Sequence, residues 1–91
     1  MRRANPSVIA RHPVNELDLT IRIEWDGDTK NWVTYVPELN NISTFGQTEL
    51  EALDNTAEMI MGFIEASERQ GLRLPLSERE LAKIRSALAG Y

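Results

Sequence analysis

One run, residues 24–57, constrains the fold most, because it carries the signals of a hairpin, a bend, a third strand and a helix start without interruption. The segment Asp26–Lys30 has turn chemistry, with Gly27 able to take a positive φ, and a β-rich stretch, Trp32–Val36, follows it. This order predicts two antiparallel strands joined by a short loop.

The strand before this loop is marked by alternation of apolar and polar residues. The apolar positions are Leu17, Leu19, Ile21, Ile23 and Trp25. A period of two predicts a half-buried strand, because successive side chains of a strand point to opposite faces. In the second strand both faces are apolar, with Trp32 and Val36 on one face and Val33 and Tyr35 on the other. Since one helix covers only one face, we expect the other face or a strand edge to meet a partner.

A third strand and a long helix follow the second strand. Pro37 ends the ladder of hydrogen bonds, and residues 42–45 predict a short strand that ends near Gly46. Thr48 and Glu51 have the spacing of a capping box, which marks a helix start. The apolar residues after it recur at helical spacing: Leu50, Leu53, Ala57, Ile60, Met61 and Ile64. We predict about twenty residues of helix packed on the sheet, with Gly71 as its left-handed stop.

The last part of the chain predicts one more strand and one more helix. Leu72–Leu74 is long enough for a short edge strand, which Pro75 prevents from being a central one. Ser77 and Glu80 repeat the capping box, and residues 78–89 carry a narrow apolar stripe suited to a lid or a dimer contact. The predicted class is therefore α+β, a small antiparallel sheet (β-β-β-α-β) with one long helix packed on one face and a short C-terminal helix.

Domain organisation and charge divide the chain at residue 17. Residues 1–16 have two prolines and no sustained period, which predicts an irregular basic arm unless it docks, and residues 17–91 form a single domain. Arg2, Arg3 and Arg11 against Glu16 give the arm +2, so the remainder of a chain of net charge −4 carries −6. We expect His12, the sole histidine, to be a solvated residue of this arm.

Composition excludes several classes of protein. The chain has no cysteine, which removes disulfides, thiolate zinc sites and cysteine nucleophiles. No apolar run approaches the roughly 20 residues that span a bilayer, and no secretory signal follows the first residues, so we expect a cytoplasmic protein without a membrane partner. An acidic body repels phosphate, so direct nucleic-acid binding is not expected.

No residue pattern predicts catalysis. Asp26 and Asp28 lack the further oxygen ligands of a calcium loop, and turn formation is their expected role. Ser43, Thr44 and Ser77 have no base beside them in the sequence. We therefore predict no catalytic residue, no metal site, no cofactor and no enzymatic activity.

An ordered set of residues resembles the HicB family. It begins with an acid-and-glycine turn and a tyrosine-valine strand, continues through a proline-leucine bend, and ends at a capped helix start, within residues 17–75. The matching positions are Asp26, Gly27, Val33, Tyr35, Val36, Pro37, Leu39, Gly46, Thr48, Glu51, Ala52, Leu53 and Asn55. The chain departs from the family pattern at Asn40–Asn41, where Pro-Gly is usual, and after Pro75 it lacks the length of a DNA-binding domain.

The resemblance implies an antitoxin of short form that binds and blocks a small basic mRNA endonuclease of the HicA type. We expect a non-catalytic protein-binding domain that forms a homodimer or higher homo-oligomer. The expected contact residues are Trp32, Tyr35, Pro37, Glu38 and Leu39. Two alternatives remain open: an orphan HicB-like homo-oligomer without a toxin, and a small regulatory module that senses a ligand between sheet and helix.

Overall fold

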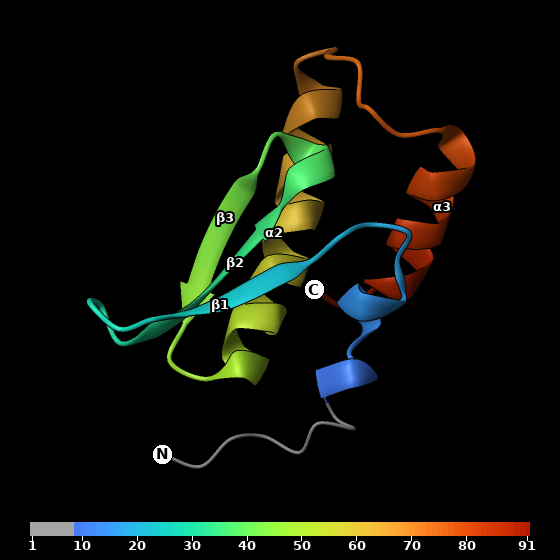
Figure 1. Ribbon diagram of the computed structural model, residues 1–91. Helices are drawn as coiled ribbons and strands as arrows, with labels where there is room; N and C mark the ends of the chain where they lie inside the picture. Colours follow the sequence, from blue (N-terminus) through green and yellow to red (C-terminus); the bar gives the residue numbers. More distant parts are fainter. Residues whose placement is uncertain (1–8) are drawn as a thin grey trace.

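The computed structural model describes residues 9–91 and has the predicted α+β class. Three antiparallel strands lie in the order β1-β2-β3, one long helix packs against one face of this sheet, and a shorter helix lies beside the long one (Figure 1). The strands are β1 (Arg22–Asp26), β2 (Asn31–Val36) and β3 (Ile42–Gly46). The helices are α2 (Glu49–Arg69) and α3 (Glu78–Ala87), with the short 3-10 helices η1 (Pro13–Glu16) and η2 (Pro37–Leu39).

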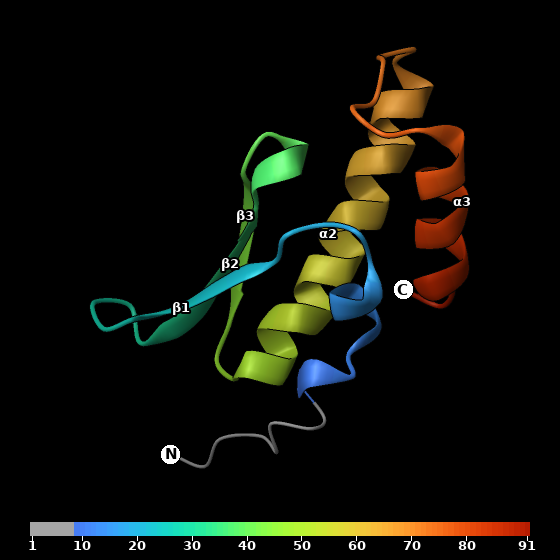
Figure 2. The same cartoon turned by 45° about the vertical axis from the view of Figure 1, so that its right-hand side comes forward.

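The interior forms where α2 crosses the sheet and where η1 and α3 close over the other side of α2 (Figure 2). The core consists of Val14, Leu17, Val36, Leu39, Leu53, Ala57, Ile60, Ile64, Ile84 and Leu88. Thr34 is also fully buried and faces α2, because its hydroxyl shares a hydrogen bond with the Thr56 hydroxyl. The Thr56 hydroxyl donates to the Ala52 carbonyl at 2.7 Å, so Thr34 must be the donor to Thr56.

The start of α2 is built by local sequence and by a close approach to β3. The Glu51 amide donates to Thr48 Oγ1 at 3.0 Å, as predicted, while the Glu51 carboxylate accepts from the Gln47 amide at 3.0 Å, one residue before the cap. A Cβ at Gly46 would lie 2.4 Å from the Ala52 amide nitrogen, so only glycine fits there. The helix therefore begins directly against the end of β3.

The first strand is shorter than predicted. Residues 17–21 precede β1 rather than belong to it, and the ladder begins at the pair Arg22 and Tyr35. The ladder does not extend toward residue 17, because β2 ends where Pro37 begins η2. The Thr20 amide therefore donates to the Glu38 carboxylate, at 2.8 Å, and not to a strand carbonyl. The apolar residues of this segment still point inward, with Leu17 buried.

The turn after β1 is confirmed, with a different residue in the left-handed conformation. The Asp26 carboxylate accepts from the Asp28 amide at 3.0 Å and from the Thr29 hydroxyl at 2.8 Å. Lys30, with φ of 57°, takes the positive φ that was expected of Gly27. These hydrogen bonds, first that from Thr29, lower the pKa of Asp26.

The predicted fourth strand is wrong. Leu72–Leu74 is extended but pairs with no strand among the described residues, and Leu72 is 58% exposed. The reason is length: 21 residues of helix span roughly 30 Å, whereas a strand of 5 residues spans only about 17 Å. The chain therefore leaves α2 beyond the end of β3, at Gly71 with φ of 69°, and crosses to α3 (Figure 1).

The last helix packs against its own chain. Ser77 and Glu80 form the predicted capping box, with both of its hydrogen bonds at 3.1 Å. Ile84 and Leu88 are buried in the core, and the helix ends at Ala87 rather than at residue 89. The stripe that suggested a lid or a dimer contact is thus used inside the chain.

The prediction of a solvated His12 is wrong. His12 is only 4% exposed, and Val14 beside it is fully buried in the core. The physical reason is that α2 presents the Asp54 carboxylate to the His12 ring while the neighbouring apolar residue fills the core. The predicted arm also includes residues 1–8, which lie outside the described residues.

Candidate partner-binding surface

The face of the sheet opposite α2 is covered by no helix of residues 9–91 (Figure 2). Because Thr34 and Val36 face α2, the alternate residues of β2 must face away from it. The strand register places two rows on this open face: Glu24, Val33 and Phe45 in one, and Arg22, Tyr35 and Ser43 in the other. We call these six residues the open sheet face.

The middle of the open sheet face is apolar and its β1 side is charged. Phe45 is 59% exposed, and the side chains of Val33 and Tyr35 are half-buried by their neighbours. The Tyr35 hydroxyl donates to the Glu24 carboxylate at 2.7 Å, which links the side chain to the neighbouring strand β1. Such an arrangement, an aromatic centre with a charged rim, is typical of surfaces that bind another protein.

The structure places the predicted contact residues on different parts of the fold. Tyr35 lies on the open sheet face, whereas Trp32 lies on the face toward α2, half-buried. Pro37 is half-buried, Glu38 is exposed, and Leu39 is fully buried in the core. Of the five, Tyr35 therefore lies on the open sheet face, whereas Glu38 is exposed on η2.

The bend after β2 is anchored by its carboxylate. Partial burial raises the pKa of Glu38, but hydrogen bonds from its own amide and from Thr20 outweigh that effect, so the pKa lies below its ordinary value. Asn40 and Asn41 follow, with φ of 59° and 54°, and so reverse the chain without a glycine. The ionised side chain of Glu38 thus links the bend after β2 to the segment before β1, through its hydrogen bond with the Thr20 amide.

Sequence reasoning missed Phe45 as a surface residue. The register needed to place it beside Val33 follows from the turn between β2 and β3, which the sequence does not specify closely. It also missed the contact between Trp25 and Trp32, whose ring centroids are 5.3 Å apart near the end of the hairpin. The spacing of both residues around the predicted turn is the signal that could have paired them.

A second polar cluster joins both ends of the described chain to α2. The Val14 amide donates to His12 Nδ1 at 3.1 Å, so the other ring nitrogen, Nε2, carries the proton and donates to Asp54 Oδ1 at 2.8 Å. The Tyr91 hydroxyl also donates to Asp54 Oδ1, at 3.2 Å. Both ring nitrogens of His12 are occupied and the ring is buried, so this arrangement serves as a structural link between distant segments.

The electrostatics of Tyr91 follow from this cluster. Partial burial, and then the hydrogen bond and the negative charge of Asp54, raise the pKa of the Tyr91 hydroxyl above its ordinary value. The ring of Tyr91 is tilted over the His12 ring, with centroids 5.8 Å apart. The neutral hydroxyl is therefore the form that stabilises the fold.

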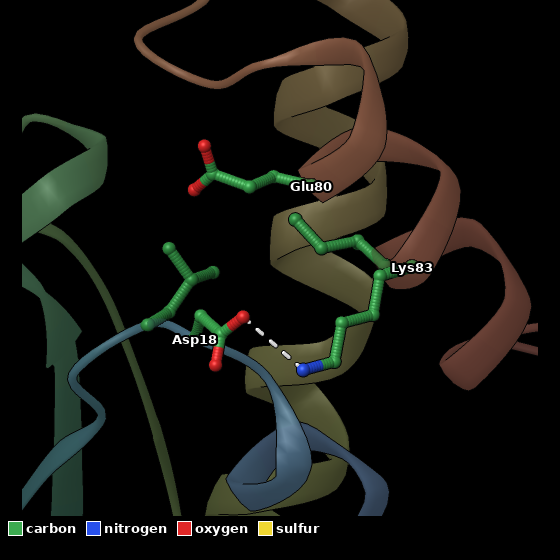
Figure 3. A pocket seen from close by; sticks show the side chains of 5 residues that line it. Asp18, Glu80 and Lys83 are labelled. Atoms are coloured by element: carbon green, nitrogen blue, oxygen red, sulfur yellow. Dashed lines mark hydrogen bonds and ion pairs between the residues drawn. The ribbon is translucent and has the colours of Figure 1, made fainter.

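One hollow lies between the segment before β1 and α3 (Figure 3). Asp18, Leu19, Glu80, Lys83 and Ile84 line it, and Lys83 Nζ lies 3.1 Å from Asp18 Oδ2 across its mouth. Its volume is about 190 Å³, open solvent included. This volume is less than the several hundred Å³ typical of small-molecule sites. This hollow lies away from the sheet–helix interface where a ligand-sensing module would hold its ligand.

Within residues 9–91, no three histidine or acidic side chains come together as ligands for a metal ion. None of the helices described has the length and apolar content needed to cross a membrane. Comparison of the chain with protein-family models, with curated proteins and with solved structures found no match.

Proposed function

We propose that this chain is a non-catalytic binding protein, an antitoxin of the HicB-like type that neutralises a small basic endonuclease by direct contact. The observation that carries the proposal is the open sheet face, an uncovered aromatic surface on a sheet whose other face is closed by α2. The HicB-like sequence pattern across residues 17–75 supports the same function.

Charge supports a basic partner. The chain has a net charge of −4, and the predicted arm carries +2 of it, so residues 17–91 account for −6. An acidic surface attracts a basic protein at long range and speeds its association. The exposed ring of Phe45 would then supply the desolvated contact that such complexes need at their centre.

The test is binding and inhibition with a matched pair of variants. Phe45 and Leu72 are equally exposed, at 59% and 58%, but only Phe45 lies on the open sheet face. A tagged full chain would first be used to isolate a small basic protein from its native cells, and inhibition of RNA cleavage by that protein would be measured. We expect Phe45→Ser to weaken binding by about tenfold or more, and Leu72→Ser to leave it unchanged.

The outcomes separate the candidate functions. If no basic protein is captured, or if the captured protein binds both variants as tightly as the wild-type chain, the antitoxin proposal fails. An orphan homo-oligomer would then remain as the alternative.

A further inference from the structure

Two tryptophans lie together near the end of the β1–β2 hairpin. Trp25 is paired with Trp32 across the two strands, and both lie on the face toward α2, because Thr34 on that face is two residues from Trp32. Their ring centroids are 5.3 Å apart. The hairpin projects away from both helices (Figure 1), and Trp25 is 44% exposed. These two rings, which we call the tryptophan pair, thus leave apolar surface that the rest of residues 9–91 does not cover.

Carboxylates surround the tryptophan pair on the two elements that meet there. Gly46 is paired with Trp32 in the sheet and lies against the first turn of α2, so that turn is close to the pair. The acidic residues are Asp26 and Asp28 at the hairpin turn and Glu49 and Glu51 in the first turn of α2. Lys30 is the one basic residue of the hairpin turn. An aromatic surface with an acidic rim suits arginine, whose guanidinium group stacks on aromatic faces and pairs with carboxylates.

The chain before Ile9 supplies two arginines within reach of this surface. Residues 1–8 read Met-Arg-Arg-Ala-Asn-Pro-Ser-Val, with Arg2 and Arg3 and no acidic residue. Ile9 packs against the core beside the start of α2 (Figure 2), and His12 is hydrogen-bonded to Asp54 in the second turn of that helix. A helix with its side chains is about 10–12 Å across, whereas the chain from Ile9 back to Arg2 spans up to about 23–25 Å when extended. Residues 1–8 can therefore pass the start of α2 and reach the tryptophan pair.

We propose that residues 1–8 dock on the tryptophan pair, with the guanidinium groups of Arg2 and Arg3 against the indole rings and the neighbouring carboxylates. The segment is purely basic and the rim is mainly acidic, so the two attract each other. The partial positive charge at the start of α2 opposes arginine, but the carboxylates of Glu49 and Glu51 in that turn offset it.

The covalent connection favours this segment over a separate basic chain. A short tether keeps residues 1–8 at an effective concentration on the order of millimolar beside the site, which a separate chain must exceed to displace them. The docked segment would cover the side of the hairpin that faces α2, whereas the open sheet face lies on the other side of the same strands. The proposal therefore adds an intramolecular contact that is distinct from the surface assigned to the toxin.

Paramagnetic broadening of NMR signals in the full chain tests this placement. The chain has no cysteine, so Ala4→Cys provides a single attachment site for a nitroxide spin label. The chain has two tryptophans, and we expect both indole N–H signals to lose most of their intensity when the label is present. Arg2→Glu combined with Arg3→Glu should restore that intensity. The matched control, Arg73→Glu combined with Arg79→Glu, reverses two exposed arginines outside the site and should leave the signals broadened.

Three results would overturn the proposal. The first is a spin label that leaves both indole signals unchanged. The second is equal broadening by the natural and the charge-reversed segments, since the tether alone would then explain the loss of intensity. The third is broadening that a spin-labelled chain produces in a separate, isotope-labelled chain, which would make a second copy the occupant. The amide signals in the same spectra show that each variant is folded. Because Phe45 is unchanged throughout, these results do not bear on the proposed function.

Discussion

The two sides of α2 differ in charge and in what covers them. One side carries acidic residues that bind side chains from distant parts of the sequence. His12 and Tyr91 form hydrogen bonds with Asp54, and Arg85 forms an ion pair with Glu68. The side toward β3 carries no charged residue at Asn55, Met59, Gly62, Phe63 and Ala66, and of these Gly62 and Ala66 are exposed. The acidic side is thus linked to distant segments by polar contacts, although the side chains of Asp54 and Glu68 each stay 49% exposed. The difference shows that distant segments of the chain meet α2 through its acidic residues, whereas β3 meets it through an uncharged side.

The largest expected effect is on the side of α2 that faces α3 (Figure 2). Leu88 is fully buried where α3 closes the core, so Leu88→Ala should lower the free energy of unfolding by about 3 kcal/mol through lost burial and a residual cavity. Leu72→Ala is the control, because that leucine is 58% exposed and should lose less than about 0.5 kcal/mol. Urea denaturation of both variants measures the difference. Similar losses in the two would show that α3 is not held by its apolar residues.

A smaller effect of opposite sign is expected on the side toward β3. Gly62→Ala should raise the free energy of unfolding by about 0.5–1 kcal/mol, because alanine favours the helix and its Cβ meets no atom within 4 Å. Gly71→Ala should lower it, since φ at Gly71 is 69°. Thermal and urea unfolding at low concentration would measure both. A loss of stability in Gly62→Ala would mean that Gly62 is required within the monomer.

The smallest effect concerns Tyr91 and appears only at alkaline pH. Its pKa is raised in the folded chain by burial and by Asp54, so the neutral hydroxyl contributes stability that is complete below the ordinary pKa of tyrosine. That contribution is lost as pH rises through the higher folded pKa. The wild-type chain should therefore lose stability above pH of about 10 more steeply than Tyr91→Phe. Parallel alkaline profiles of unfolding for the two chains would contradict the role given to this hydroxyl.

Signals carried by neighbouring residues were read correctly from the sequence. The turn at Asp26, the cap at Thr48, the left-handed stop at Gly71 and the capping box at Ser77 all form as predicted. Each depends on hydrogen bonds or backbone conformation within a few residues, which is why a sequence pattern suffices to place it. The α+β class follows from these local elements and their order.

The candidate surfaces could be predicted only in part. The two-sided apolar pattern of β2 indicated an open face that includes Tyr35, but the exposure of Phe45 depends on the register of β3. Leu39, expected as a contact residue, fills the core because η2 turns it inward. The uncharged side of α2 is visible as a helical pattern, yet which neighbour it faces is known only from the contact between Asn55 and Phe45.

By itself, the sequence determined the three strands, the long helix with its ends, and the acidic balance of the chain, because periodicity, caps and charge are properties of neighbouring residues. Only the tertiary structure decided that His12 is buried against Asp54 and that residues 72–74 miss the sheet. The first depends on the packing of η1 against α2, and the second on where a helix of 21 residues carries the chain relative to strands of 5 and 6 residues. Contacts between segments 40 or more residues apart are set by that geometry, which no local pattern encodes.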